Sequence, residues 1–158
     1  MYSIKPISDS IRNIVTAQII ENWAGPFVVS MGTLHDTRLL AGFVALEDGE
    51  VLGYTLYNIA DSDCEIVVLE SLRENQGIGS MLVSKVVEIA HSADCGRVWL
   101  VTTNDNIRAI RFYQRIGFSL RAVHINSIEQ SRKLKPQIPL TGFDGIPIKH
   151  EFEFERVW

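Results

Sequence analysis

A glycine turn between a buried strand and an amphipathic helix constrains this sequence more than any other feature. The apolar run Cys64–Leu69 ends in a polar loop, and Gly77 and Gly79 then open a helix. The apolar positions of that helix, spaced four, four and three residues apart, are Ile78, Leu82, Val86 and Ile89. Glycines let the backbone turn tightly and let a ligand approach its amides, and the first N–H groups of a helix attract anions. The turn therefore predicts a phosphate or pyrophosphate site, although a plain strand-to-helix turn explains the two glycines equally well.

Two other phosphate-binding motifs fit this turn poorly. A P-loop requires a lysine directly after its last glycine, and Ser80 stands there. The dinucleotide-binding fingerprint expects a third glycine near the position of Val83 and an acidic residue about 20 residues further on, whereas Asp94 belongs to a loop.

The pattern of elements around the turn predicts one α/β domain spanning residues 1–158, without repeats or linkers. The expected strands are Tyr2–Ile7, Ala41–Leu46, Val51–Ile59, Cys64–Leu69, Val98–Thr102, Phe118–Ile125 and Ile148–Val157. Helices are expected from Asp9 or Ser10 to Trp23, from Ile78, around Arg108–Arg115, and over Ser127–Leu134. Cys64–Leu69 and Val98–Thr102 flank a helix, which predicts a parallel β–α–β crossover. In the last strand, phenylalanines alternate with glutamates, which predicts one buried and one solvated face.

The composition narrows the classes of partner. A formal net charge of −4 without a basic stripe gives no indication of nucleic acid as a partner. The sequence has no apolar run of membrane-spanning length and no signal-like segment, so we expect a cytoplasmic protein without a membrane partner. Cys64 and Cys95 are far apart and the four histidines are scattered, so we expect free thiols and no metal site.

A second segment, Asn106–Phe118, has an asparagine, an alanine three residues later, then Phe112-Tyr113 and Gly117-Phe118. It closely resembles the second signature of the GNAT N-acetyltransferases, and the stretch ending Gln76–Gly79 resembles the acyl-CoA turn of that family. The two stand in the family's order, separated by one helix and one strand, and the resemblance covers at least Cys64 to Arg121. It implies a mixed, mostly antiparallel sheet flanked by helices, with two splayed parallel strands in the middle.

The resemblance also implies a reaction and a set of cofactor contacts. The chain would transfer an acetyl group from acetyl-CoA to a primary amine by direct attack in a ternary complex. The pantetheine arm is expected to contact the strand backbone of Val67, Val68 and Leu69. The pyrophosphate is expected to contact the turn formed by Glu74, Asn75, Gln76, Gly77, Ile78, Gly79 and Ser80. Further contacts with the cofactor are expected from Asn106, Ala109 and Tyr113. Asn106 would contact the pantetheine or cap a helix, and Tyr113 would protonate the leaving thiolate.

Two acidic residues, Glu65 and Glu74, stand at positions where a carboxylate is unexpected. Glu65 lies in an apolar strand, where a charge is costly unless it is paired or faces a cleft. It is the candidate general base, with a structural ion pair or a solvated strand end as the alternative. Glu74 occupies a position where the family usually has arginine or glutamine, and we expect its side chain to point to solvent.

The sequence leaves four classes of acceptor open: a small amine, an amino acid, an antibiotic and a protein α-amine.

The long connection 127–147 is interpreted either as a cover for the acceptor end of the cleft or as a dimer contact or surface excursion. His35 and Asp36 either line an acceptor pocket or, as we expect, form a surface turn. We expect a monomer or a homodimer. The alternatives to an enzyme are a non-catalytic acyl-CoA-binding module of the same fold and an unrelated nucleotide-binding domain.

Overall fold

The computed structural model describes all 158 residues of the chain as four α-helices, nine strands and two 3₁₀ turns. The helices are α1 (Asp9–Trp23), α2 (Ile78–Ser92), α3 (Ile107–Arg115) and α4 (Ser127–Leu134). The strands are β1 (Ser3–Pro6), β2 (Phe27–Ser30), β3 (Thr33–Asp36), β4 (Ala41–Glu47), β5 (Glu50–Ala60), β6 (Asp63–Ser71), β7 (Arg97–Thr103), β8 (Ser119–His124) and β9 (Glu151–Val157). The 3₁₀ turns are η1 (Thr37–Leu39) and η2 (Phe143–Gly145). No helix has both the length and the apolar composition needed to cross a membrane.

Seven of the strands form one sheet in the order β1-β4-β5-β6-β7-β9-β8. All neighbouring pairs in it are antiparallel except β6 and β7, which run parallel. Helix α2 connects these two strands, as the predicted β–α–β crossover requires. The structure thus confirms the predicted α/β class and the mixed, mostly antiparallel sheet.

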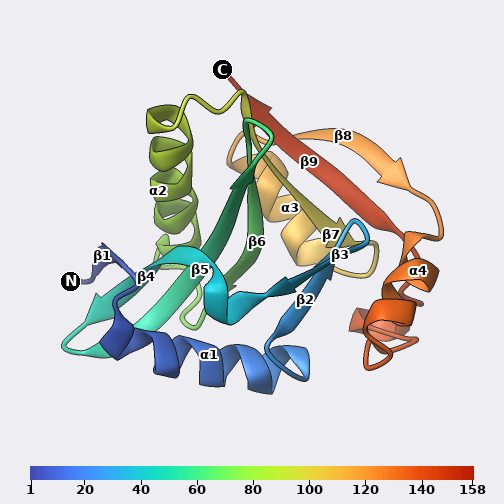
Figure 1. Ribbon diagram of the computed structural model, residues 1–158, viewed down its shortest axis with the longest axis horizontal. Helices are drawn as coiled ribbons and strands as arrows, with labels where there is room; N and C mark the ends of the chain where they lie inside the picture. The colour runs from blue at the N-terminus through green and yellow to red at the C-terminus, as the bar shows by residue number, and fades with distance from the viewer.

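The helices cover opposite faces of this sheet (Figure 1). Helices α2 and α3 pack on one face, where Val86, Tyr113 and Phe154 belong to a single apolar core with β6, β7 and β9. Helix α1 packs on the other face through Val15 and Ile19, which are four residues apart and fully buried. Burial of such apolar stripes supplies most of the stability of helices in proteins.

Strands β6 and β7 are paired over only the first part of their length. The register joins the run 63–65 of β6 to the run 97–99 of β7 and then stops. Beyond it, β6 continues beside β5 as far as Ser71, and β7 continues beside β9 as far as Thr103. From Ile66 onward the facing edges have no strand partner, and Figure 1 shows the two strands diverging.

A β-bulge lies at the point of divergence. Leu56 pairs with Val68 and Tyr57 pairs with Ile66, so Val67 has no partner residue on β5. A bulge bends its strand and increases the local twist. The bend turns β6 away from β7 and leaves the β6 edge open between the two strands.

The hairpin of β2 and β3 was not predicted from the sequence. These four-residue strands pair with each other over Phe27–Asp36 and are joined by Met31 and Gly32, both with positive φ (47° and 75°). Two positive φ values are the requirement of a type I′ hairpin turn, which sequences usually signal by Asn-Gly or Asp-Gly. Methionine at the first position concealed the turn, and the expectation of a surface turn at His35 is wrong because His35 is buried.

Gly42 on β4 tests how closely the sheet is packed. A Cβ at this position would overlap the carbonyl oxygen of Thr55 and lie 2.7 Å from Cδ2 of Leu56. We expect Gly42→Ala to lower the free energy of unfolding by about 3 kcal/mol, because overpacking displaces the backbone of β5. Urea denaturation of Gly42→Ala and Gly96→Ala measures the effect; at Gly96 a Cβ would meet nothing within 4 Å, so that variant should be nearly neutral. Equal stabilities of the two variants would contradict the packing described here.

Candidate active site

Two cavities meet where β6 and β7 diverge. The first, which we call the glycine cleft, has a volume of about 680 Å³ and lies between the end of β6, the glycine turn, the start of α2, and α3. The sequence-predicted residues that line it are Leu69, Glu74, Asn75, Gly77, Ile78, Gly79, Ser80, Asn106, Ala109 and Tyr113. The structure therefore brings together most of the predicted site around one cleft.

The second cavity, which we call the α4 cavity, has a volume of about 650 Å³. It lies between the end of α1, β2, the diverging parts of β6 and β7, and the connection that carries α4 and η2. Of the predicted site residues it includes Val67 and Asn106. Three residues line both cavities: Glu70, Asn106 and Phe143. These three mark the junction between the cavities.

The remaining predicted residues lie elsewhere. Val68 is buried in the core beneath α1, and Gln76 uses its backbone carbonyl to accept a hydrogen bond from the Tyr2 hydroxyl (3.2 Å). Glu65 lines neither cavity. The strand backbone near Val68 still belongs to the open edge of β6, but its side chain faces away from both cavities.

The glycine turn has the geometry of an anion site. Gly77 caps α2 in the left-handed conformation (φ 72°), and the first backbone hydrogen bond of the helix runs from Met81 N–H to the Gly77 carbonyl at 3.1 Å. The N–H groups of the preceding residues, 78–80, have no backbone or side-chain acceptor in the chain. They point along the helix axis at the positive end of the α2 dipole, which favours a bound anion.

Gly79 allows α3 to approach the turn closely. A Cβ on Gly79 would lie 3.2 Å from Cζ of Phe112, closer than ordinary van der Waals contact. A larger residue would push Phe112 out of place and narrow the glycine cleft, because both residues line it. The packing of α3 thus explains why glycine stands at this second position.

Asn106 fixes the start of α3. Its side-chain oxygen accepts a hydrogen bond from Ala109 N–H at 3.2 Å, so the predicted capping role is confirmed. The cap places Tyr113 two turns further along the helix, where its side chain is 6% exposed and lines the glycine cleft. Burial, with the nearby Glu70 carboxylate as a smaller cause, raises the pKa of Tyr113. The phenol therefore stays protonated at neutral pH.

The Glu74 side chain is exposed to solvent as predicted, and it also forms an ion pair with Arg108 of α3. Both residues line the glycine cleft. Arg108, Arg111 and Arg115 all line the cleft, so an arginine-rich helix faces the glycine turn. Glu74 thus pairs with one of these arginines, in the same cleft as the residues that carry the free amides of α2.

Glu70 is the ionisable group at the junction of the two cavities, and sequence reasoning did not identify it. It precedes the loop at the end of β6, on the face of the sheet that α1 covers. Burial raises the pKa of Glu70, against a smaller opposing effect of the Trp23 indole. The carboxyl is thus shifted towards the range in which a general base works at neutral pH. An acidic residue at the last half-buried position of an apolar strand was the signal available in the sequence.

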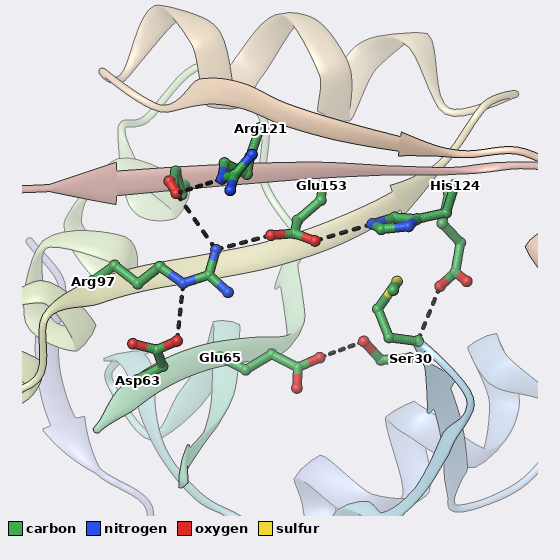
Figure 2. Close-up of polar contacts among 10 residues, drawn as sticks. Ser30, Asp63, Glu65, Arg97, Arg121, His124 and Glu153 are labelled. Atoms are coloured by element: carbon green, nitrogen blue, oxygen red, sulfur yellow. Dashed lines mark hydrogen bonds and ion pairs between the residues drawn. The ribbon is translucent and has the colours of Figure 1, made fainter. Parts of the chain in front are cut away.

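Glu65 belongs to a separate buried cluster, shown in Figure 2. It accepts a hydrogen bond from the Ser30 hydroxyl of β2, and the His35 Nε2 atom lies 3.6 Å from its Oε2 atom. Glu65 is 6% exposed. Ser30 lines the α4 cavity, so Glu65 is connected to that cavity only through the serine.

The prediction that the glutamate face of the last strand is solvated is wrong. Figure 2 shows Arg97 between Asp63 (3.0 Å) and Glu153 (2.8 Å), and Glu153 also contacts the His124 ring at 3.0 Å. Although burial raises the pKa of Glu153, the Arg97 guanidinium and the His124 ring outweigh it and hold that pKa low. At the start of the strand Glu151 is only 2% exposed. The partners of these glutamates come from neighbouring strands, Arg97 from β7 and His124 from β8. The pattern of a single strand does not show such partners.

The connection between β8 and β9 forms one wall of the α4 cavity, through α4 and the segment 137–143. Lys135 connects this wall by hydrogen bonds to the opposite wall, which the end of α1 and β2 form. Its ammonium donates to the carbonyls of Trp23, at the end of α1, and Phe27 (2.7 Å for the latter). Burial lowers the pKa of Lys135, and no carboxylate pairs with it. The lysine thus satisfies the Trp23 carbonyl, which the end of α1 leaves free, and a carbonyl of β2.

The chain matches the acetyltransferase (GNAT) family over residues 9–118. It is 39% identical over 158 residues to the Bacillus subtilis (strain 168) protein YdhI, and the match covers 99% of each chain. It is 35% identical over 150 residues to YxbD of the same organism, covering 94% of each chain.

Solved acetyltransferase structures share the fold. The IAA acetyltransferase from Bacillus cereus ATCC 14579 has a TM-score of 0.72 at 15% identity, covering 100% of both chains. A Bacillus subtilis acetyltransferase in complex with CoA has a TM-score of 0.69 at 15% identity, covering 100% of this chain and 99% of that one. A GNAT family acetyltransferase from Elizabethkingia anophelis with acetyl-CoA bound has a TM-score of 0.71 at 16% identity, covering 99% of this chain and 98% of that one.

The pair of Glu74 and Arg108 predicts how the cleft responds to a charge change. We expect Glu74→Gln to lower the dissociation constant for CoA about two- to fivefold, because the variant removes a negative charge from the cleft and releases Arg108; exposed charge pairs have effects of this size. Calorimetric titration measures the constant, and the gain should shrink at high salt.

Glu88→Gln is the matched control for this prediction, because Glu88 lies on α2 and pairs with Lys85 outside the cleft. Weaker CoA binding by Glu74→Gln would mean that Glu74 positions Arg108 instead of competing for it.

Proposed function

The chain belongs to the GNAT family of acetyltransferases, and we propose that it transfers an acetyl group from acetyl-CoA to a primary amine held in the α4 cavity. The observation that carries the proposal is the junction at which the glycine cleft and the α4 cavity share Glu70, Asn106 and Phe143. Two substrates that enter from opposite faces of the sheet would meet there. This arrangement supports direct transfer between them.

The glycine cleft fits CoA on two independent grounds. The free N–H groups of residues 78–80 and the arginines of α3 suit the pyrophosphate and its charge. The open edge of β6 from Ile66 to Leu69 offers backbone donors and acceptors to the amide groups of a pantetheine arm, in the manner of an added strand. Bound acetyl-CoA would supply the activated acetyl group.

Tyr113 is the proposed proton donor to the leaving thiolate. It lies in the glycine cleft, and its raised pKa keeps the phenol protonated at neutral pH, so a proton is present when the sulfur leaves. Burial disfavours a free thiolate as well as a phenolate, so the departing sulfur is the proposed acceptor of that proton. No other phenol lines the cleft, and the four arginines there do not release a proton at neutral pH.

Glu70 is the proposed general base. An attacking ammonium must lose a proton before its nitrogen bonds to the acetyl carbon, and the carboxylate that lines both cavities is the one in reach of that point. Glu65, the base proposed from the sequence, would have to act through the Ser30 hydroxyl. We therefore assign Glu65 the role of fixing Ser30 and β2 at the wall of the cavity.

The proposed mechanism has no acyl-enzyme intermediate. Cys64 and Cys95 are buried in the core beneath α2, and burial raises the pKa of the Cys64 thiol to about 12. A thiol in that environment is neither ionised nor accessible. Glu70 accepts a proton from the ammonium, and the carbon–nitrogen bond then forms and the carbon–sulfur bond breaks. Tyr113 gives a proton to the sulfur, and the proton that the nitrogen releases on becoming an amide restores the phenol.

The α4 cavity is the proposed acceptor site, and the connection 127–147 sets its selectivity. Its volume of about 650 Å³ falls in the range of small-molecule sites. The side chains of Ile128, Lys135, Ile138 and Phe143 come from this connection and close the cavity. A folded polypeptide chain would have to displace them, whereas a small amine would not.

Two isosteric variants distinguish the carboxylates. We expect Glu70→Gln to lower kcat for acetyl transfer about 100-fold or more, the usual contribution of a general base, while Glu65→Gln lowers it less than about tenfold. Because the pKa of Glu70 is raised, kcat of the unaltered protein should fall as the pH drops through a value above that of an ordinary glutamate. That fall should be absent in Glu70→Gln. Release of CoA thiol from acetyl-CoA in the presence of an amine panel is the readout.

A loss in Glu65→Gln as large as that in Glu70→Gln, with unchanged thermal stability, would overturn the assignment of the base. Binding of acetyl-CoA without transfer to any amine would favour a non-catalytic acyl-CoA-binding module.

A further inference from the structure

Two buried carboxylates in the α4 cavity have no positive partner. Glu151 is 2% exposed and Asp105 is 3% exposed, and both line the cavity. Each uses one oxygen for a backbone N–H: Glu151 accepts from Met31 (3.3 Å) and Asp105 accepts from Phe143 (3.1 Å). The other oxygen of each, Oε1 of Glu151 and Oδ1 of Asp105, has no hydrogen-bond partner.

A buried carboxylate without a cationic partner lowers the free energy of unfolding. Burial of a carboxylate without a cation or a full set of hydrogen bonds opposes folding, and proteins normally pair such groups. A single neutral N–H satisfies only part of the demand. Two of these carboxylates around one cavity indicate that their partner is a ligand instead of a residue of the chain.

The ionisable residues that line the α4 cavity are mostly acidic, like Glu151 and Asp105. Its carboxylates are Glu21, Glu70, Asp105 and Glu151, and its one basic residue is Lys135. The ammonium of Lys135 is held by the carbonyls of Trp23 and Phe27 and forms no ion pair. Arginine and histidine do not contribute to the lining. The cavity therefore presents a surplus of negative charge to any molecule inside it.

We propose that the acceptor is a small amine with a second cationic group, and that Glu151 and Asp105 bind this second group. The inference rests on the proposed function, because it assigns the α4 cavity to the acceptor. Glu70 receives the amine that is acetylated, and the two buried carboxylates hold the distal ammonium or amidinium group.

The positions of the carboxylates in the sheet support this division. Glu70 stands on β6, at the junction with the glycine cleft. Glu151 lies beside Thr103 at the end of β7, and Asp105 follows that strand. The carboxylates thus stand on opposite sides of the gap between β6 and β7. A molecule that reaches from one side to the other needs a cation at each end.

The hydrogen bonds of Glu151 and Asp105 have a second consequence. Because Met31 belongs to the β2–β3 turn and Phe143 to η2, the two carboxylates join the cavity wall to both covering segments. A purely structural role would use these same bonds, and an isosteric amide can keep them. Amide variants therefore separate the charge of the side chain from its role in folding.

The test compares diamines from 1,3-diaminopropane to 1,6-diaminohexane with the monoamine of the same length. We expect at least one diamine to have a kcat/KM about tenfold or more above that of its monoamine, since hydrogen bonds to charged groups give gains of this size. Glu151→Gln and Asp105→Asn should each reduce that preference towards unity. Glu129→Gln is the matched control, because Glu129 is exposed on α4 and does not line the cavity.

Calorimetric titration of the CoA-saturated protein with the same amines gives a readout that does not depend on turnover. Tighter binding of a diamine than of its monoamine, lost in either folded amide variant, supports the inference. Equal binding, or a preference that survives in both variants, overturns it. If monoamines and diamines are acetylated with equal kcat/KM, only this inference fails. If acetyl-CoA does not bind and no amine is acetylated, the proposed function fails too. Thermal unfolding of each variant shows whether it is folded, and two variants keep the test available if one is not.

Discussion

The early separation of β6 from β7 is the constraint on which the rest of the site depends. The two strands pair only through residues 63–65 and 97–99, and the bulge at Val67 then turns β6 away. A sheet that opens in its middle exposes backbone groups that must find partners elsewhere. Here they face the glycine cleft on one side of the sheet and the α4 cavity on the other. One backbone feature thus creates the glycine cleft, the α4 cavity and the junction between them, where we propose that cofactor and acceptor meet.

The ionisable groups around this opening follow a consistent division. Arginines gather at the glycine cleft, where the free amides of α2 also favour an anion. Carboxylates gather in the α4 cavity, and two of them are buried without a cation. Glu70 stands at the boundary, and burial raises its pKa. This division supports the proposal that a phosphate-bearing substrate binds on the positive side and an amine on the negative side. The cost in stability of the unpaired carboxylates is consistent with a functional site.

Local patterns predicted the residues of the glycine cleft far better than those of the α4 cavity, the proposed acceptor side. The glycine turn, the cap at Asn106 and the position of Tyr113 depend on short spacings within one loop and one helix, so the sequence alone located them. The acceptor side depends on contacts between distant segments. Glu151 becomes a cavity residue only through its pairing with β7, and Lys135 only through carbonyls more than a hundred positions away. The β2–β3 hairpin was missed because methionine occupies a turn position that usually signals itself by asparagine or aspartate.

We propose that the opening between β6 and β7, together with the glycine turn, is an acetyl-CoA site. Calorimetric titration with acetyl-CoA, beside NAD and ATP, tests it most directly, using the unaltered protein and Gly79→Leu. We expect selective binding of acetyl-CoA that is weakened at least about tenfold by the leucine, since its side chain would collide with Phe112 and narrow the cleft. Absence of acetyl-CoA binding by the folded protein, or equally tight binding of NAD or ATP, would show that this opening is not an acetyl-CoA site.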